Sequence, residues 1–264
     1  ELDEARRQYP ELNLIPRFSV KWLWMTTRAN FWVFNSRMPQ WLKKNAGTIY
    51  IQTWHGTPLK KLGSDIQEVA MPGTNTEQYK NNFIFEASRW NYLIAPNEYS
   101  EHIFKHAFQF QNDILETGYP RNDELVNNGN KQSLQNELKE KIIGKKEGRV
   151  ILYAPTWRDD YFIKKGSYKF YMPFDLKKLL NCLDQEDTLV IRPHYLVGDS
   201  IDTEGFEDRV KVCVHENINE LYLISDLLIT DYSSVMFDFA ILRRPMLFYP
   251  YDIAHYKEKL RGFY

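Results

Sequence analysis

Two histidines and several arginines follow strand-like runs in this 264-residue chain, and these residue types are the ones best suited to chemistry. His55 and Gly56 come soon after the β-branched and aromatic run 48–53, which predicts a strand. His194 closes an Arg-Pro-His sequence at the end of a second such run, 188–192. Ligands of parallel α/β sheets bind outside the carboxyl ends of the strands, so residues at these positions should lie at one edge. The candidates at strand ends are His55, Gly56, Thr57, Arg121, Thr156, Arg158, Arg192, His194, Asp231, Ser233 and Ser234.

These side chains suit an anionic ligand such as a nucleotide diphosphate. One guanidinium group can donate two parallel hydrogen bonds to the oxygens of a phosphate, and hydroxyl groups add further donors. Ser233 and Ser234 precede the segment 235–242, whose apolar residues fall at helical spacing, and a helix N-terminus attracts phosphate. No cluster of thiols, imidazoles and carboxylates has the spacing of metal ligands. The sequence therefore predicts an anion site that needs neither a metal ion nor a cofactor.

Each candidate also has a purely structural explanation, and the residues alone leave both open. His55 and His194 could be satisfied core histidines, and Arg158 could pair with a neighbouring aspartate at the surface. The segment 225–250 could be a capped helix between two strands with nothing bound.

Composition limits the function classes. A formal net charge of −1 gives no broad basic field, so we expect no nucleic acid partner. The two cysteines cannot form a disulfide framework, and no apolar run reaches the roughly 18 residues that a membrane span requires. The chain does not begin with Met, and we expect it to be a piece of a longer protein, truncated at both ends.

Strand-like and helix-like runs alternate along most of the chain, which predicts two doubly wound parallel sheets in the α/β class. We expect an N-terminal domain over 1–126 and a C-terminal domain over 149–264. The Gly/Asn-rich and then charged stretch 127–148, with a helix over 131–143, predicts a linker. Residues 1–16 are expected to be turn-like, and a helix is expected around 83–90 after a polar loop.

Four segments resemble the signature segments of the CDP-glycerol glycerophosphotransferase family, the teichoic acid polymerases and primases of Gram-positive bacteria. They are 53–61 (TWHGTPLKK), 154–159 (APTWRD), 192–194 (RPH) and 225–238 (SDLLITDYSSVMFD). The resemblance runs in register from about residue 17 to the end of the chain. It implies a GT-B-like fold, in which two Rossmann-like parallel-sheet domains face each other across a cleft, with the acceptor on the N-terminal side and the nucleotide donor on the C-terminal side.

The resemblance also implies a reaction. A hydroxyl at the end of a lipid-linked teichoic acid chain, poly(glycerol phosphate), attacks the glycerol-bearing phosphate of CDP-glycerol, and CMP leaves. His55 would be the general base and His194 would bind or neutralise the donor diphosphate, while Ser233 and Ser234 would hold phosphate. The other substrate-binding candidates are Gly56, Thr57, Arg121, Thr156, Arg158, Arg192 and Asp231.

The enzyme would work as a peripheral protein on the cytoplasmic face of the membrane. Three alternatives remain: a CDP-ribitol-dependent ribitol-phosphate transferase, a GT-B nucleotide-sugar glycosyltransferase or epimerase, and a binding module without catalysis.

Overall fold

The computed structural model describes residues 2–69, 75–156, 162–164, 167–168, 172–194, 201–256 and 262–264. The chain forms two compact units, each with its own parallel sheet. The first unit comprises Glu1–His55, Gly63–Asp65 and Asn75–Gly118, and the second comprises Gly56–Leu62, Ile66–Thr74 and Tyr119–Tyr264.

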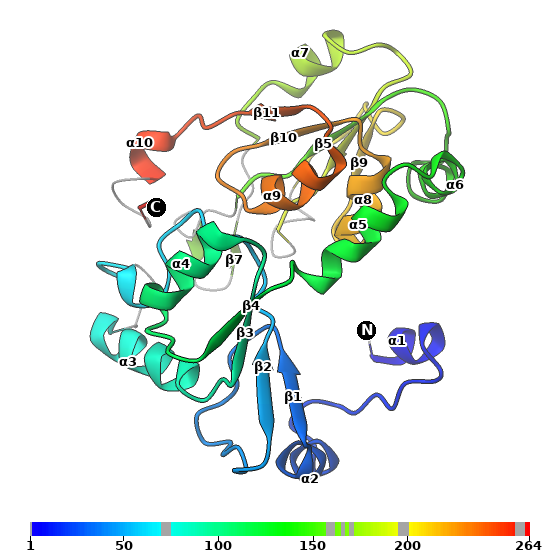
Figure 1. The fold of residues 1–264 in the computed structure, drawn as a ribbon. Coiled ribbons are helices and arrows are strands. Elements are labelled where there is room, and N and C mark those ends of the chain that lie inside the picture. The colour runs from blue at the N-terminus through cyan, green and yellow to red at the C-terminus, as the bar shows by residue number, and fades with distance from the viewer. Residues whose placement is uncertain are drawn as a thin grey trace. The chain divides into compact units, whose positions relative to one another are not determined.

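The first unit contains a four-stranded sheet in the order β1-β2-β3-β4, with every neighbouring pair parallel (Figure 1). Its strands are β1 (Phe31–Phe34), β2 (Ile49–Gln52), β3 (Tyr92–Ala95) and β4 (Asp113–Glu116). Its helices are α1 (Leu2–Gln8), α2 (Val20–Arg28), η1 (Gly63–Asp65), α3 (Thr76–Ala87) and α4 (Glu98–Ala107).

Aromatic side chains make up much of the core of this unit. Trp32, Tyr50 and Trp90 are at most 2% exposed, and the ring centroids of Trp32 and Tyr50 lie 5.4 Å apart. Phe83 and Phe108, from the helical side of the sheet, stack at 5.0 Å. The high aromatic content of the sequence therefore serves packing here.

The second unit contains a five-stranded parallel sheet in the order β11-β10-β5-β8-β9. Its strands are β5 (Val150–Tyr153), β8 (Thr188–Ile191), β9 (Val210–Val212), β10 (Leu227–Thr230) and β11 (Met246–Phe248), and a separate hairpin is formed by β6 (Phe162–Lys164) and β7 (Ser167–Tyr168). Its helices are η2 (Pro120–Asn122), α5 (Asp123–Asn128), α6 (Gln132–Ile143), α7 (Leu176–Asn181), α8 (Ile218–Ile224), α9 (Val235–Phe239), η4 (Ala240–Leu242) and α10 (Ile253–His255).

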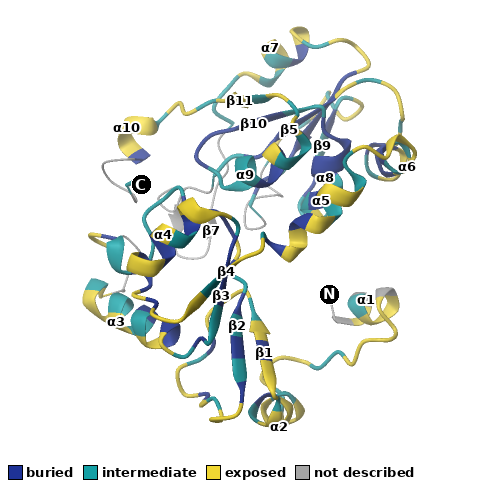
Figure 2. Ribbon diagram, viewed as in Figure 1, coloured by how far each residue is buried: buried dark blue, intermediate teal, exposed yellow. Residues whose placement is uncertain are grey.

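Both faces of this second sheet are covered, as expected for a doubly wound unit. Alternate residues of β5 point to opposite sides: Val150 and Leu152 join one hydrophobic cluster, and Ile151 and Tyr153 join the other. All four residues of β5 and of β8 are buried, and α8 is mostly buried, dark blue in Figure 2. The continuous apolar runs of the sequence therefore form the central strands.

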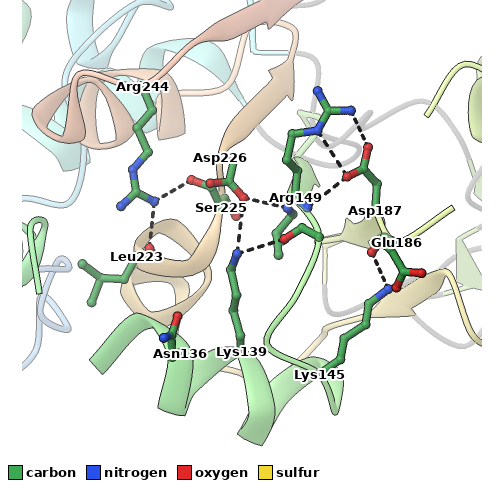
Figure 3. Close-up of polar contacts among 12 residues, drawn as sticks. Asn136, Lys139, Lys145, Arg149, Glu186, Asp187, Leu223, Ser225, Asp226 and Arg244 are labelled. Carbon is green, nitrogen blue, oxygen red and sulfur yellow. Dashed lines mark hydrogen bonds and ion pairs between the residues drawn. The ribbon is translucent and has the colours of Figure 1, made fainter. Parts of the chain in front are cut away.

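A charged network ties the amino-terminal ends of these strands together (Figure 3). Arg149, just before β5, donates from Nη2 to Asp187 Oδ2 at 2.6 Å, just before β8. Asp226, just before β10, accepts from the backbone N–H of Val150 at 2.8 Å, and Lys139 Nζ lies 3.5 Å from its carboxylate. These contacts fix the strands at the edge of the sheet opposite to their carboxyl ends.

The prediction of two parallel-sheet α/β units is confirmed. Two local expectations differ. Residues 1–16 contain α1, and α3 begins at Thr76, where the Asn75 side chain caps it by accepting from Gln78 N at 2.9 Å. The helix expected over 131–143 within the stretch 127–148 is present as α6, and its Leu138 and Ile143 are buried in the core of the second unit.

Candidate functional site

The backbone turns sharply where β2 ends. Trp54 has a φ of +55°, which is uncommon for a residue with a side chain. Its N–H donates to Gln52 Oε1 at 2.9 Å, and its indole is 8% exposed, packed against Phe104 and Phe108. The buried ring therefore holds the strained backbone in place.

This turn presents His55 at the surface of the first unit. Its ring stacks on the Trp54 indole with centroids 4.3 Å apart, and Nδ1 lies 2.7 Å from the backbone oxygen of Asn35. A carbonyl oxygen can only accept, so Nδ1 carries the proton and Nε2 of the neutral ring keeps its lone pair. Nε2 makes no hydrogen bond to any of the described residues. A neutral imidazole whose tautomer is fixed in this way can accept a proton at Nε2.

A side chain at Gly56 would crowd Ser234. Its backbone is outside the left-handed region, but a Cβ placed on it would lie 3.1 Å from Ser234 Oγ and 3.6 Å from Ser234 Cβ. The unusual backbone angle of this turn belongs to Trp54, two residues earlier. Gly56 thus lets the chain approach the serine hydroxyl within the second unit.

A pocket of about 360 Å³ lies at the carboxyl ends of β5, β8 and β10 in the second unit. Five of the predicted substrate-binding or catalytic residues line it together, with Lys60 and Tyr256 beside them. The five are Thr156, Arg192, His194, Ser233 and Ser234. The rule that ligands bind at strand ends therefore identifies residues that share one cavity.

Arg192 gives this pocket its positive charge. Burial lowers the pKa of its guanidinium and the nearby Glu216 opposes that effect, but the group remains charged at neutral pH. Nη1 donates to the backbone oxygen of Cys213 at 2.9 Å, and no carboxylate of the described residues forms an ion pair with it. A half-buried cation without a carboxylate partner is a suitable site for phosphate.

Asp231 has a structural place in the site. It is 6% exposed, and Oδ1 accepts from the backbone N–H groups of Thr156, at 2.8 Å, and of Tyr232. It thereby ties the loop after β5 to the end of β10. The helix after it, α9, is only five residues long, and Ser234 at its start makes no side-chain capping bond and is one of the residues that line the pocket.

Two predicted residues do not line this pocket. Arg121 pairs with Asp238 at 2.7 Å and its guanidinium lies over the Tyr119 ring at 4.8 Å. Thr57 is 5% exposed next to Gly56. The predicted Arg158 lies outside the described residues.

Two residues with a place in these arrangements are not among the sequence candidates. Lys60 lines the pocket of the second unit and stands in the segment 53–61, five residues after His55. Asn35 acts through its backbone oxygen, which no side-chain pattern can reveal.

In the described part of the chain, no three His, Cys, Asp or Glu side chains gather closely enough to hold a metal ion. Within the same residues, no helix has the length and apolar character to cross a bilayer.

The model of the CDP-glycerol:poly(glycerophosphate) glycerophosphotransferase family matches residues 2–264. The chain belongs to this family. It is 56% identical over 256 residues to a teichoic acid poly(glycerol phosphate) polymerase of Bacillus spizizenii, and 50% identical over 252 residues to a teichoic acid glycerol-phosphate transferase of Staphylococcus aureus. These alignments cover 96% and 95% of this chain but 64% of each relative, so the chain spans less than two thirds of either.

Solved structures of a family member have the same fold. The wall teichoic acid polymerase TagF matches with a TM-score of 0.88 at 44% identity, covering 100% of this chain and 69% of the other. A variant of TagF soaked with CDPG matches with a TM-score of 0.85 at 43% identity, again covering 100% and 69%. The fold of this chain is therefore GT-B-like, as the resemblance implied.

Proposed function

We propose that the protein transfers glycerol phosphate from CDP-glycerol to the terminal hydroxyl of a lipid-linked poly(glycerol phosphate) chain, with release of CMP. The observation that carries the proposal is the pocket of the second unit, where Arg192, His194 and the two serines converge. Membership of a glycerophosphotransferase family supports the same activity.

In this proposal the pocket binds the donor. The Arg192 guanidinium and the hydroxyls of Ser233 and Ser234 bind the diphosphate of CDP-glycerol, and His194 donates to its oxygens. Neutralising the oxygens of the transferred phosphate and of the departing CMP stabilises charge in the transition state. Lys60, with its Nζ 5.3 Å from the centre of the Tyr256 ring, adds a second cation to the same pocket.

The first unit supplies the base. Nε2 of His55 removes the proton of the acceptor hydroxyl as that oxygen attacks phosphorus, while the bond to the bridging oxygen of CMP breaks. The Nδ1–H bond to Asn35 O stabilises the imidazolium that forms, because Nδ1 keeps its proton and donates it to the same backbone oxygen throughout.

We further propose that the protein acts at the cytoplasmic face of the membrane. Apolar side chains on and beside α2 are unusually exposed for their size, with Val20 at 86%, Phe18 at 60%, Trp24 at 57% and Trp41 at 61%. Aromatic and basic residues together favour the interface of an anionic bilayer, where a lipid-linked acceptor resides.

The test is CMP release from CDP-glycerol by the purified protein in the presence of a glycerol-phosphate acceptor. His55→Gln should lower kcat by about 10²- to 10⁴-fold while donor affinity by calorimetry stays the same. His102→Gln, an exposed histidine of α4 in the same unit, is the matched control and should turn over normally. Full activity in His55→Gln would remove the proposed base. If CDP-ribitol or a UDP-sugar turned over faster than CDP-glycerol, the transferred group would be ribitol phosphate or a sugar and not glycerol phosphate.

A further inference from the structure

A second pocket lies in the first unit and is rich in arginine. It has a volume of about 510 Å³, and the lining residues that matter are Arg17, Ser36, Arg37, Gln40, Asn82 and Glu86; we call it the arginine pocket. None of these residues belongs to the donor pocket of the second unit.

The guanidinium groups of Arg17 and Arg37 are available to bind an anion. The Arg37 guanidinium lies over the rings of Tyr79 and Phe83, at 5.1 and 4.8 Å from their centroids, and that of Arg17 lies 4.8 Å from the centroid of Phe18. Stacking uses the flat face of a guanidinium and leaves the N–H donors on its edge available. Neither arginine forms an ion pair with any residue in the described part of the chain.

The one carboxylate of the pocket is already neutralised. Glu86 is 1% exposed, and its Oε2 lies 3.1 Å from Arg89 Nη1. Its Oε1 accepts from the backbone N–H of Met38 at 3.0 Å and from the hydroxyl of Tyr50 at 2.7 Å. The pocket therefore carries net positive charge and suits an anion with several oxygens.

The lining of the arginine pocket continues the segment that orients His55. Asn35, whose backbone oxygen holds His55 Nδ1, is followed directly by Ser36 and Arg37 of the pocket. Two residues span at most about 7 Å between their Cα atoms, so the backbone of Arg37 lies close to the residue that orients the proposed base.

The lining of the pocket is also next in sequence to exposed aromatic residues. Arg17 precedes Phe18 and Gln40 precedes Trp41, and the ring centroids of Phe18 and Trp41 lie 6.5 Å apart. Exposed aromatic side chains beside cationic ones favour an anionic ligand that is attached to a lipid.

We propose that the arginine pocket binds a phosphodiester group of the acceptor chain close behind the hydroxyl that is attacked. The proposal rests on the function proposed above and names the part of the protein that recognises the acceptor. The same chemistry could also receive the phosphate of an anionic lipid headgroup, and the experiment separates the two sources.

The main measurement is the acceptor dependence of CMP release with a soluble oligo(glycerol phosphate) and no lipid present. Arg37→Gln and Arg17→Gln should each raise the acceptor KM about five- to tenfold, the loss expected for one partly exposed charge-assisted contact. The KM for CDP-glycerol should stay within about twofold, and Arg37→Lys, which keeps the charge, should recover part of the loss. Arg6→Gln, an exposed arginine of α1, is the matched control and should leave both KM values unchanged.

Two further binding measurements show whether the bound phosphate belongs to the acceptor chain or to a lipid, and whether binding persists without the proposed activity. Binding of the same oligomer, measured by calorimetry without CDP-glycerol, should weaken in Arg37→Gln even if the unsubstituted protein releases no CMP, so the two proposals can fail separately. Binding to phosphatidylglycerol vesicles should change little. An unchanged acceptor KM and oligomer affinity in variants that fold normally would overturn the proposal, and a loss confined to vesicle binding would assign the pocket to lipid.

Discussion

A methyl group added at Gly56 should crowd Ser234, and the crowding should vanish when the serine hydroxyl is removed. In Gly56→Ala the new Cβ would lie 3.1 Å from Ser234 Oγ, closer than an ordinary contact between carbon and oxygen, and 3.6 Å from Ser234 Cβ, which is ordinary. In the double variant Gly56→Ala/Ser234→Ala only the 3.6 Å contact remains.

The sizes of the opposing effects follow from this geometry. Overpacking costs about 1–3 kcal/mol, and the low end applies because a hydroxyl can rotate away. Replacing glycine by alanine at an ordinary backbone conformation gains about 0.4–1 kcal/mol through the unfolded chain. The single variant should therefore change the free energy of unfolding by less than about 1 kcal/mol, while the coupling energy between the two sites should be about 1 kcal/mol.

Hydrogen exchange of the β5 and β10 amides measures the free energy of unfolding of each variant, because both strands lie inside the sheet of the second unit. The four proteins of the cycle are compared at one pH, and Gly47→Ala, whose Cβ would meet nothing within 4 Å, serves as the control partner for Ser234→Ala. Additivity within about 0.3 kcal/mol for Gly56 would refute the steric role assigned to this glycine.

Three other variants test the second unit. Arg192→Met should raise the KM for CDP-glycerol about 10- to 100-fold in CMP-release assays, because it removes a half-buried cation; an unchanged KM would contradict its place in the donor site. Arg244→Met should cost about 2–4 kcal/mol in thermal unfolding, since Nη1 donates to the backbone oxygens of Leu223 and Ser225 at the end of α8; a shift below about 1 °C would argue against that role. Burial alone would raise the pKa of Asp187, but hydrogen bonds from Arg149 hold the pKa below its usual value, so the ionised carboxylate stabilises the fold above about pH 4 and this contribution is lost as pH falls through the folded pKa. Asp187→Asn should therefore be less stable than the parent at pH 7 and similar to it in acid, measured by denaturant unfolding across pH; a constant difference would refute the linkage.

The strands were predictable because each is marked by a short run of apolar or β-branched residues in the local sequence. The run Val150–Tyr153 is apolar throughout, since β5 is buried on both faces, and no other element type explains so short a run as well. The start of α3 was not predictable in the same way. Its first turns are polar, and only the cap from Asn75 marks where the helix begins. Capping residues such as asparagine are also common in turns, so the polar residues before residue 83 predict a loop there.

The candidate site was predictable where its side chains follow the strands of one sheet directly. It was less predictable where a side chain pairs with a residue far away in the sequence. Arg192 and His194 follow β8 directly, so the topology rule was enough to bring them into one pocket with Ser234. Arg121 satisfied the same rule, but its guanidinium pairs with Asp238, 117 residues away, and no local pattern indicates such a partner.

The position of the proposed base depends on packing more than on hydrogen bonds. A left-handed backbone at a residue such as Trp54 costs on the order of 1–2 kcal/mol, and a local hydrogen bond network does not offset that by itself. The indole is fixed against Phe104 and Phe108, and His55 in turn stacks on the indole. The core of the first unit therefore carries the strain that turns the imidazole toward Asn35.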